Sequence, residues 1–175
     1  LTAAGAIIST VDAPMLDRAH ALHDGGGFAG PESAQLHRDM LKQYRDLYDP
    51  RVSVRIETGF SALASDYVQL GLDRKARMSE ATALLAPYDA IICPTVACVA
   101  PLISEAAASD DAYATLNLLL LRNTGLINAL DGCAATLPCH EAGAPPVGLM
   151  VAGMGGSDAK ILAVASSLEA LLSPS

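Results

Sequence analysis

The sequence predicts an α/β domain in which one sheet is covered by helices. Short β-rich apolar runs alternate along the chain with longer segments whose apolar residues recur at helical spacing, which is the pattern of strands connected by helices. The chain has 175 residues, of which 51% are hydrophobic, and this is enough apolar material for one domain core. Four apolar runs are expected to share the sheet: residues 5–11, 89–93, 134–137 and 147–152.

Two helices are expected after the first of these runs. Pro14 stands at a first-turn position and opens an amphipathic helix that reaches about His23. A glycine-rich segment, DGGGFAG, then interrupts the helical pattern, and Pro31 starts a second helix that reaches about Leu47. This helix is expected to end at the sequence Tyr-Asp-Pro, because Pro50 disfavours a helical conformation at the residue before it.

A long helix follows, with Ser61 as its expected N-cap and its end near Pro87. Arg74 lies on the apolar stripe of this helix, where an arginine must either extend outward or find a carboxylate. Asp66 and Glu57 are the candidate partners. We therefore expect Arg74 to form a structural ion pair.

The second half of the chain is expected to hold the rest of the sheet. The continuous apolar run at residues 89–93 predicts a strand buried on both faces. The polar, acidic residues 104–114 are expected to form a surface loop, and residues 116–130 a helix. The last two strands then pair across a Gly-Ala-Pro-Pro turn, and Ser157 caps a final helix.

The composition excludes several classes of protein. A net charge of −8 and an isoelectric point near 4.8 disfavour nucleic acid or an anionic membrane as a partner, because both require a basic surface. The longest strongly apolar run, LNLLLL, is far shorter than the roughly 20 residues that cross a bilayer, and a cytoplasmic protein is expected. The cysteines form no compact C-x-x-C pair, so free thiols are expected at Cys93, Cys98, Cys133 and Cys139.

Some patterns have the residue types of a cofactor or metal site without its context. Gly25, Gly27 and Gly30 match the letters G-x-G-x-x-G, yet a dinucleotide-binding turn follows a strand and here a helix comes first. His20 and His23 lie one turn apart, but histidines on polar helix faces are usually solvated, and the cysteine spacings are too wide for a structural zinc site. No cofactor and no metal are expected.

A thiol nucleophile is also not expected. Cys139 stands beside His140, but neighbouring residues on a strand point to opposite faces and cannot form the bond between nucleophile and base. Ser157 follows two glycines without completing a G-x-S-x-G elbow. The sequence therefore predicts no catalytic residue within this chain.

Three segments, in this order and spacing, resemble the C-terminal part of the amidase signature family, serine hydrolases that cleave amide bonds. They are YDPRVSVRIETG at residues 48–59, YDAIICPT at 88–95, and NALDGCAATLPCHE at 128–141 with the following PPVGLMVAGMGGSDAKIL. Asn128, Pro138 and Gly148 match the family pattern, whereas Asp131 and Cys133 stand where glycine and proline are usual.

The resemblance implies a mixed sheet flanked by helices and a serine, serine, lysine triad that lies upstream of these segments. No such glycine- and serine-rich segment is present, and the chain opens on Leu1, so residues 1–175 are expected to be a single incomplete domain, the C-terminal fragment of an amidase that works through an acyl-serine intermediate. Its expected partners are a small-molecule amide substrate and the missing N-terminal part, with a homodimer left open. The alternative is a non-catalytic structural or binding subunit that completes a partner chain.

Three residues are the candidate substrate-binding residues. By the resemblance, Arg55 matches an arginine that reaches a substrate carboxylate or amide in some relatives. Thr95 follows the 89–93 strand, and ligands of open α/β sheets usually bind beyond the carboxyl ends of strands. Asn128 is the third candidate. We expect Arg55 to face a pocket wall formed by Thr95 and the segment near Asn128.

Overall fold

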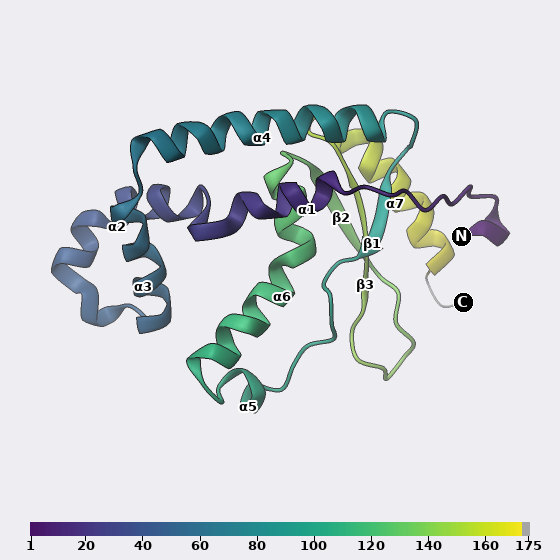
Figure 1. The fold of residues 1–175 in the computed structure, drawn as a ribbon. Helices are drawn as coiled ribbons and strands as arrows, with labels where there is room; N and C mark the ends of the chain where they lie inside the picture. Colours follow the sequence, from purple (N-terminus) through teal and green to yellow (C-terminus); the bar gives the residue numbers. More distant parts are fainter. Residues whose placement is uncertain (173–175) are drawn as a thin grey trace.

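The structure is a computed structural model, which describes residues 1–172, and it combines a small sheet with long helices (Figure 1). Short 3-10 helices, η1 to η4, continue or join several of the α-helices. The bounds are η1 Thr2–Ala4, α1 Met15–His20, η2 Ala21–Gly26, α2 Ala29–Tyr44, η3 Arg45–Leu47, α3 Pro50–Glu57, η4 Thr58–Ser61, α4 Ala64–Leu85, β1 Ile91–Pro94, α5 Ile103–Ala106, α6 Asp110–Ala129, β2 Cys133–Pro138, β3 Gly148–Gly153 and α7 Asp158–Leu172.

The three strands form one sheet in the order β1-β3-β2. Both pairings are antiparallel, with Ile91 opposite Ala152 and Thr136 opposite Met150. The central strand β3 is the most buried, and α7 covers the sheet through Ile161 and other apolar side chains. The α/β class expected from the sequence is confirmed, and within residues 1–172 each strand of the sheet runs antiparallel to its neighbour.

Two expected strands need correction. Residues 5–11 form no strand, and Ile7 among them is 95% exposed. In the described part of the chain no strand lies beside these residues, and residue types that favour strands form one only when a neighbouring strand is present. Residues 89–93 correspond to β1, but β1 is half-buried at the edge of the sheet rather than buried on both faces.

The acidic segment 104–114 was expected to be a loop and is largely helical. The side chain of Ser109 accepts a hydrogen bond from the amide of Ala112 at 3.0 Å and so caps α6. Asp110 and Asp111 lie in the first turn of that helix, where negative charge is favourable. The acidic composition therefore marks a helix start.

Of the two expected helix caps, Ser157 has the expected position and Ser61 does not, and neither side chain caps its helix. Ser61 lies in η4 and donates to the carbonyl of Thr58, while α4 begins after Leu63 without a side-chain cap. Ser157 directly precedes α7 as expected, and its carbonyl accepts from the amide of Ile161 at 2.9 Å. Its hydroxyl, however, donates to the carbonyl of Met154 rather than accepting from the helix.

Arg74 has the structural role expected of it, with different partners. Its guanidinium donates to the carbonyls of Ala129 at 2.9 Å and Asn128 at 3.2 Å, and pairs with Asp131 at 3.1 Å. The proposed partners Asp66 and Glu57 are not involved. Arg74 of α4 thus donates to two carbonyls at the end of α6, one of which, that of Asn128, also accepts from the amide of Asp131, and it holds the two helices together.

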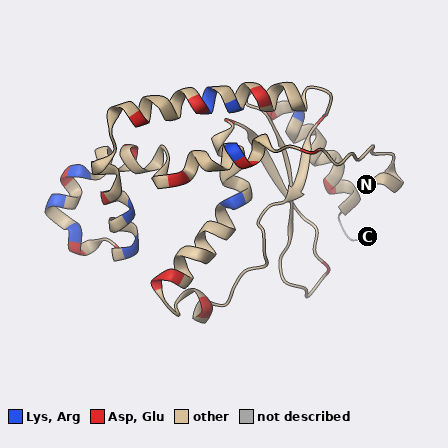
Figure 2. Ribbon diagram, viewed as in Figure 1, with Lys and Arg blue, Asp and Glu red and all other residues tan. Residues whose placement is uncertain are grey.

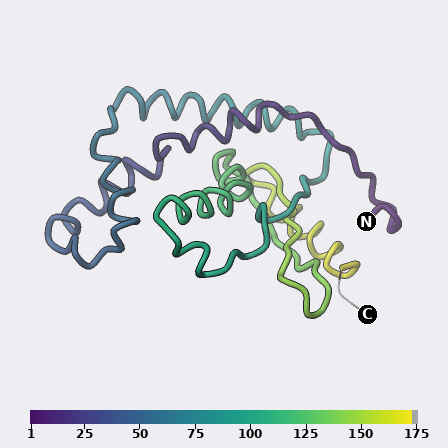
Figure 3. The backbone as a smooth tube through the Cα atoms, turned by 60° about the horizontal axis from the view of Figure 1, so that its bottom comes forward, coloured from purple at the N-terminus to yellow at the C-terminus, as the bar shows by residue number. Residues whose placement is uncertain are grey.

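Residues 29–61, comprising α2, η3, α3 and η4, lie at one end of the molecule, and we call them the helical lobe (Figures 1 and 3). The sheet and α7 lie at the other end, and the long α4 runs between the two (Figure 1). The lobe has its own small core of Ala34, Leu41 and Ile56. A separate core joins α1, α4 and α6 through Met15, Ala19, Ala81 and Leu130.

Candidate functional site

A cavity of about 830 Å³ lies between α3 of the helical lobe and the first turns of α6. Charged side chains from both helices line it together with Tyr113 and Asn117. We call this the α3–α6 cavity. The charged residues that line it are Asp49, Arg51, Arg55, Asp110 and Asp111.

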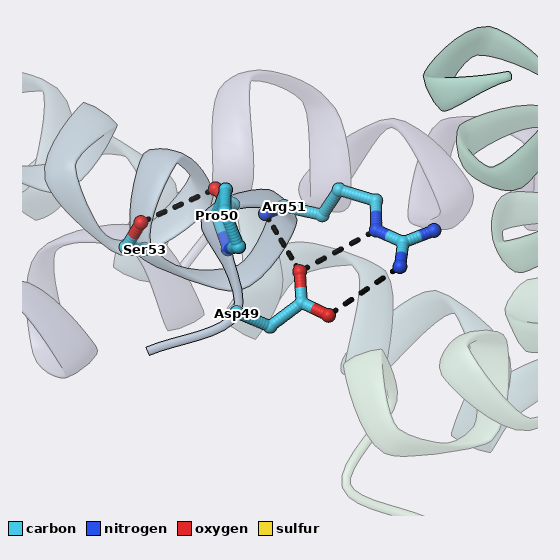
Figure 4. Close-up of polar contacts among 4 residues, drawn as sticks. All are labelled: Asp49, Pro50, Arg51 and Ser53. Carbon is cyan, nitrogen blue, oxygen red and sulfur yellow. Dashed lines mark hydrogen bonds and ion pairs between the residues drawn. The ribbon is translucent and has the colours of Figure 1, made fainter. Parts of the chain in front are cut away.

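The sequence Asp-Pro-Arg fixes the start of α3 and with it one wall of the cavity (Figure 4). Asp49 is the N-cap, and its carboxylate accepts a hydrogen bond from the amide of Arg51 at 2.8 Å, with Pro50 in the first helical position. Mainly because of that backbone hydrogen bond, the pKa of the Asp49 carboxyl is lowered below its usual value. The buried hydroxyl of Ser53 donates to the carbonyl of Pro50 at 3.2 Å and completes the first turn.

Arg51 reaches across the cavity from this cap. Its Nε and Nη2 lie 3.4 Å from the carboxylate oxygens of Asp49, and its guanidinium carbon lies 4.5 Å from the centre of the Tyr113 ring. A cation within about 6 Å of a ring face is attracted by the negative face of the ring. Arg51 therefore links α3 to α6 through Tyr113.

Arg55 lies one turn further along α3 and also lines the cavity. Within residues 1–172 its guanidinium forms no hydrogen bond and no ion pair, whereas Arg51 is held by Asp49. Basic residues gather in one part of the helical lobe: five of the chain's 11 Lys and Arg residues fall in residues 38–55, together with three Asp residues, although the lobe as a whole has five residues of each sign (Figure 2). Arg55 is thus an available cation at the cavity wall.

Thr95 lies at the end of the sheet, where β1 stops. Its amide donates to the carbonyl of Gly148 at 2.9 Å and its hydroxyl donates to the hydroxyl of Thr136 at 3.2 Å. A Cβ atom on Gly148 would lie 2.7 Å from Oγ1 of Thr95 and 2.6 Å from Cγ2 of Thr136, so only a glycine lets the two threonines meet across β3. Asn123 of α6 adds a bond from its side-chain amide to the carbonyl of Pro94 at 2.8 Å.

Asn128 lies at the opposite end of the sheet. Both β1 and β2 run antiparallel to β3, so Thr95 follows the end of one strand while Asn128 precedes the start of the other. The side chain of Asn128 is exposed, and its carbonyl accepts from Arg74. No hydrogen bond within residues 1–172 joins any two of Arg55, Thr95 and Asn128. The α3–α6 cavity includes Arg55 and neither of the others.

The helix α6 runs from the α3–α6 cavity to the end of β1. Tyr113 contacts Arg51 near its start, and Asn123 reaches the end of β1, ten residues or about 15 Å further along the helix. Sequence reasoning missed Tyr113, Asn123 and Thr136. Tyr113 lies in the acidic segment that was expected to be a loop. No local sequence pattern indicates which polar residue of a helix will contact the end of a strand.

Two of the cysteines lack the surroundings of a nucleophile. Burial raises the pKa of the Cys93 thiol, which keeps it protonated and a poor nucleophile. Cys139 and His140 both contact the carbonyl of Val147, at 3.6 and 3.4 Å, and not each other. Among the residues that the structure describes, no group of His, Cys, Asp or Glu side chains has the arrangement of a metal site.

No helix within the described residues 1–172 has both the length and the apolar character needed to span a bilayer.

Comparison with known proteins identifies the family. The amidase family profile matches residues 1–162, and the chain is 27% identical over 177 residues to 2-amino-5-chloromuconic acid deaminase from Comamonas testosteroni. It is similar to the crystal structure of an amidase, with 26% identity and a TM-score of 0.79. It shares its fold with allophanate hydrolase from Kluyveromyces lactis, with 24% identity and a TM-score of 0.85. The chain belongs to the amidase family, as its sequence predicted.

These matches cover nearly all of this chain but a smaller share of its relatives. The alignment includes 98% of the chain and 37% of the deaminase, 98% and 39% for the amidase, and 99% and 28% for the allophanate hydrolase. The matched share corresponds to the C-terminal portion of the relatives of known structure. The relatives support amide hydrolysis as the general chemistry of the family.

Proposed function

We propose that this chain forms the C-terminal part of an enzyme that hydrolyses carboxamides through an acyl-serine intermediate. The observation that carries this proposal is the amidase family match over residues 1–162. In this proposal the nucleophilic serine and its base come from polypeptide outside the chain. The chain supplies the α3–α6 cavity wall and the end of the sheet. The cytoplasmic location expected from the sequence stays a prediction.

The exposed surface supports an incomplete fold. The accessible surface is 11423 Å², whereas a compact protein of 18.0 kDa exposes about 8,000 Å². Part of the excess is apolar: Ile103 of α5 is 88% exposed and Leu118 of α6 is 65% exposed. Further polypeptide packed on α5 and α6 would remove these side chains from water and add a second wall to the α3–α6 cavity.

We further propose that the substrate carries a carboxylate as well as an amide. Arg55 offers a guanidinium without a partner in the described chain, whereas the charge of Arg51 on the same wall is paired with Asp49. Arginine matches carboxylate geometry through paired N–H donors. The relative from Comamonas testosteroni is named for an acidic substrate, 2-amino-5-chloromuconic acid. Thr95 and Asn128 remain weaker substrate-binding candidates.

The first experiment separates an enzyme part from a non-catalytic subunit. The 175-residue chain is assayed alone, and then joined to the N-terminal segment that precedes the matched region in the deaminase. The chain alone should hydrolyse carboxamides no faster than background, and the joined protein should hydrolyse them through a serine of the added segment. Turnover by the chain alone that a serine or cysteine substitution within it abolishes would overturn the proposal. An inactive but folded joined protein would favour the non-catalytic alternative.

A second prediction concerns the substrate carboxylate. In the joined protein, Arg55→Ala should raise KM about tenfold or more for the monoamide of a short dicarboxylic acid, because a hydrogen bond to a charged group contributes about 1.5–3 kcal/mol. KM for a neutral amide of equal length should change little, and Arg55→Lys should not restore binding. Arg38→Ala is the matched control, since Arg38 is an exposed arginine of the same lobe outside the α3–α6 cavity. Unchanged kinetics with a lower melting temperature would assign Arg55 to the scaffold.

A further inference from the structure

The helical lobe packs mainly on itself. Its core consists of Ala34, Leu41 and Ile56, with Tyr48 against them. The α2 and η4 helices approach so closely that a Cβ atom on Gly59 would lie 2.0 Å from the carbonyl oxygen of Gly30. The lobe is therefore built as a unit, with tight internal contacts that do not depend on the rest of the chain.

Two neighbouring connections attach this unit to the remainder of the molecule. The entering connection contains Gly25, Gly26 and Gly27, which follow one another with φ of 63°, 98° and 52°. The leaving connection passes through Ala62, which has an extended backbone. A small cavity of about 390 Å³ is lined by both connections, so the two lie side by side. Two neighbouring chain crossings, one of which contains three consecutive glycines with few backbone restrictions, are the geometry of a hinge.

One side-chain contact that holds the lobe lies next to this hinge, beside a ring contact just outside the lobe. Tyr67 at the start of α4 donates to Glu32 at 2.8 Å and stacks edge-on against Phe28, with 5.6 Å between the ring centres. Away from the hinge, the only hydrogen bond, ion pair or ring contact within residues 1–172 that joins the lobe to α6 is Arg51 over Tyr113. The α3–α6 cavity lies at this same junction.

We propose that the helical lobe rotates about the 25–27 and 62 connections as a lid over the α3–α6 cavity, and that Arg51 on Tyr113 is the contact that holds it closed. Arg51 is a positioning residue in this device: Asp49 fixes its guanidinium at the helix start, so the cation meets the ring when α3 approaches α6. A single cation–ring contact is weak enough to open on thermal motion and specific enough to define one closed position. The lid depends on neither the chemistry nor the substrate proposed above.

The chain contains no tryptophan, which provides a direct test. Tyr113→Trp introduces one fluorophore at the contact and retains an aromatic face for Arg51. Acrylamide, a neutral quencher, then reports how accessible the indole is in the 175-residue chain. The comparison is Arg51→Ala against Arg38→Ala, each in the Tyr113→Trp background, since both remove one arginine from the lobe and Arg38 has no partner among the described residues.

The expected result is a quenching constant that rises about twofold with Arg51→Ala and is unchanged with Arg38→Ala, because loss of the closing contact exposes the ring. Hydrogen exchange should quicken at residues 22–27 while the amides of α2 stay protected, which shows that the lobe moves as a folded unit. Equal quenching in both variants would overturn the lid. So would a rise in quenching accompanied by loss of protection in α2, because the contact would then support folding of the lobe instead of its position.

Discussion

The helical lobe and the sheet unit, by which we mean β1, β2, β3 and α7, bury their apolar residues very differently. In the sheet unit, Val151 of the central strand is fully buried and Ile161 of α7 packs over it. In the lobe, Leu41 and Ile56 form the centre of a much smaller core, while Leu47 is 82% exposed. The sheet unit is consequently held by its own packing, and the lobe by a few contacts near the hinge.

This difference bears on the candidate site, because the α3–α6 cavity has one wall on the loosely attached lobe. Binding elements are commonly drawn from the less stable parts of a protein, where opening costs little free energy. The firmly packed part of the molecule supplies α6 and the strand ends, and the lobe supplies Arg51 and Arg55. Four substitutions, with their controls, test this difference between the two regions, and they are given in order of decreasing effect.

The largest effect is expected from shortening a core side chain in each region. Ile161→Ala should lower the free energy of unfolding by about 2–5 kcal/mol, because it leaves a cavity between α7 and the sheet. Leu41→Ala should weaken the lobe while leaving hydrogen exchange in β3 unchanged. Urea unfolding followed by far-ultraviolet circular dichroism, with exchange measured for each element, checks both. A single shared transition lowered equally by the two variants would show that the regions are not separate in stability.

A smaller effect is expected at the close approach inside the lobe. Gly59→Ala should destabilise by about 1–3 kcal/mol, because the new methyl group would meet the immobile backbone of Gly30 and Pro31. Gly71 in the exposed middle of α4 is the control: a Cβ atom added there would have no neighbour within 4 Å, and Gly71→Ala should stabilise by about 0.5–1 kcal/mol. Thermal unfolding compares the two. Equal effects of the same sign would mean that the lobe is not tightly packed at this point.

The smallest effect concerns pH and the start of α3. The pKa of Asp49 is lowered in the folded protein, chiefly by the hydrogen bond from the amide of Arg51, so its ionised form stabilises the fold. This contribution is present above the unfolded pKa of about 3.9 and is lost as pH falls through the lower folded value. Asp49→Ala should reduce the melting temperature by about 2–4 °C at neutral pH.

The control for this prediction is Asp49→Asn, which keeps a capping oxygen and removes the charge. The difference in melting temperature between the original chain and Asp49→Asn should begin to shrink below about pH 5 and should continue to shrink as pH falls through the lowered pKa of Asp49. Glu57, whose pKa Arg45 lowers, titrates in the same direction in both proteins and cancels in the comparison. A difference that does not change with pH would exclude ionised Asp49 as a cap.

Local sequence patterns predicted most of the elements whose packing partners lie close to them in the sequence. Strands β2 and β3 form a hairpin, and both were expected within two residues of their observed bounds. The helices α2 and α4 follow from their apolar spacing and their flanking proline and glycine residues. The family followed from three short segments, whose order along the chain is itself a property of the sequence.

Other features depend on residues far apart in the chain. Residues 5–11 have strand composition but no strand beside them in the described structure, and Arg74 pairs with Asp131 in place of the expected Asp66 or Glu57. Both errors have the same cause. A strand needs a neighbouring strand, and a partly buried cation such as Arg74 needs an acceptor. Elements that are distant in the sequence supply both, so spacing along the sequence does not predict them.

The α/β class and the amidase family could be predicted from the sequence alone, because both are carried by local residue types and their order. The absence of a catalytic nucleophile from this chain stays a prediction. Only the tertiary structure decided that Arg55 shares a cavity with Tyr113 of α6, that Thr95 meets Thr136 over Gly148, and that Asn128 lies at the other end of the sheet. The first of these depends on how α3 lies against α6, and the other two on how the three strands pair. Packing geometry is a sum of many long-range contacts that no short motif contains.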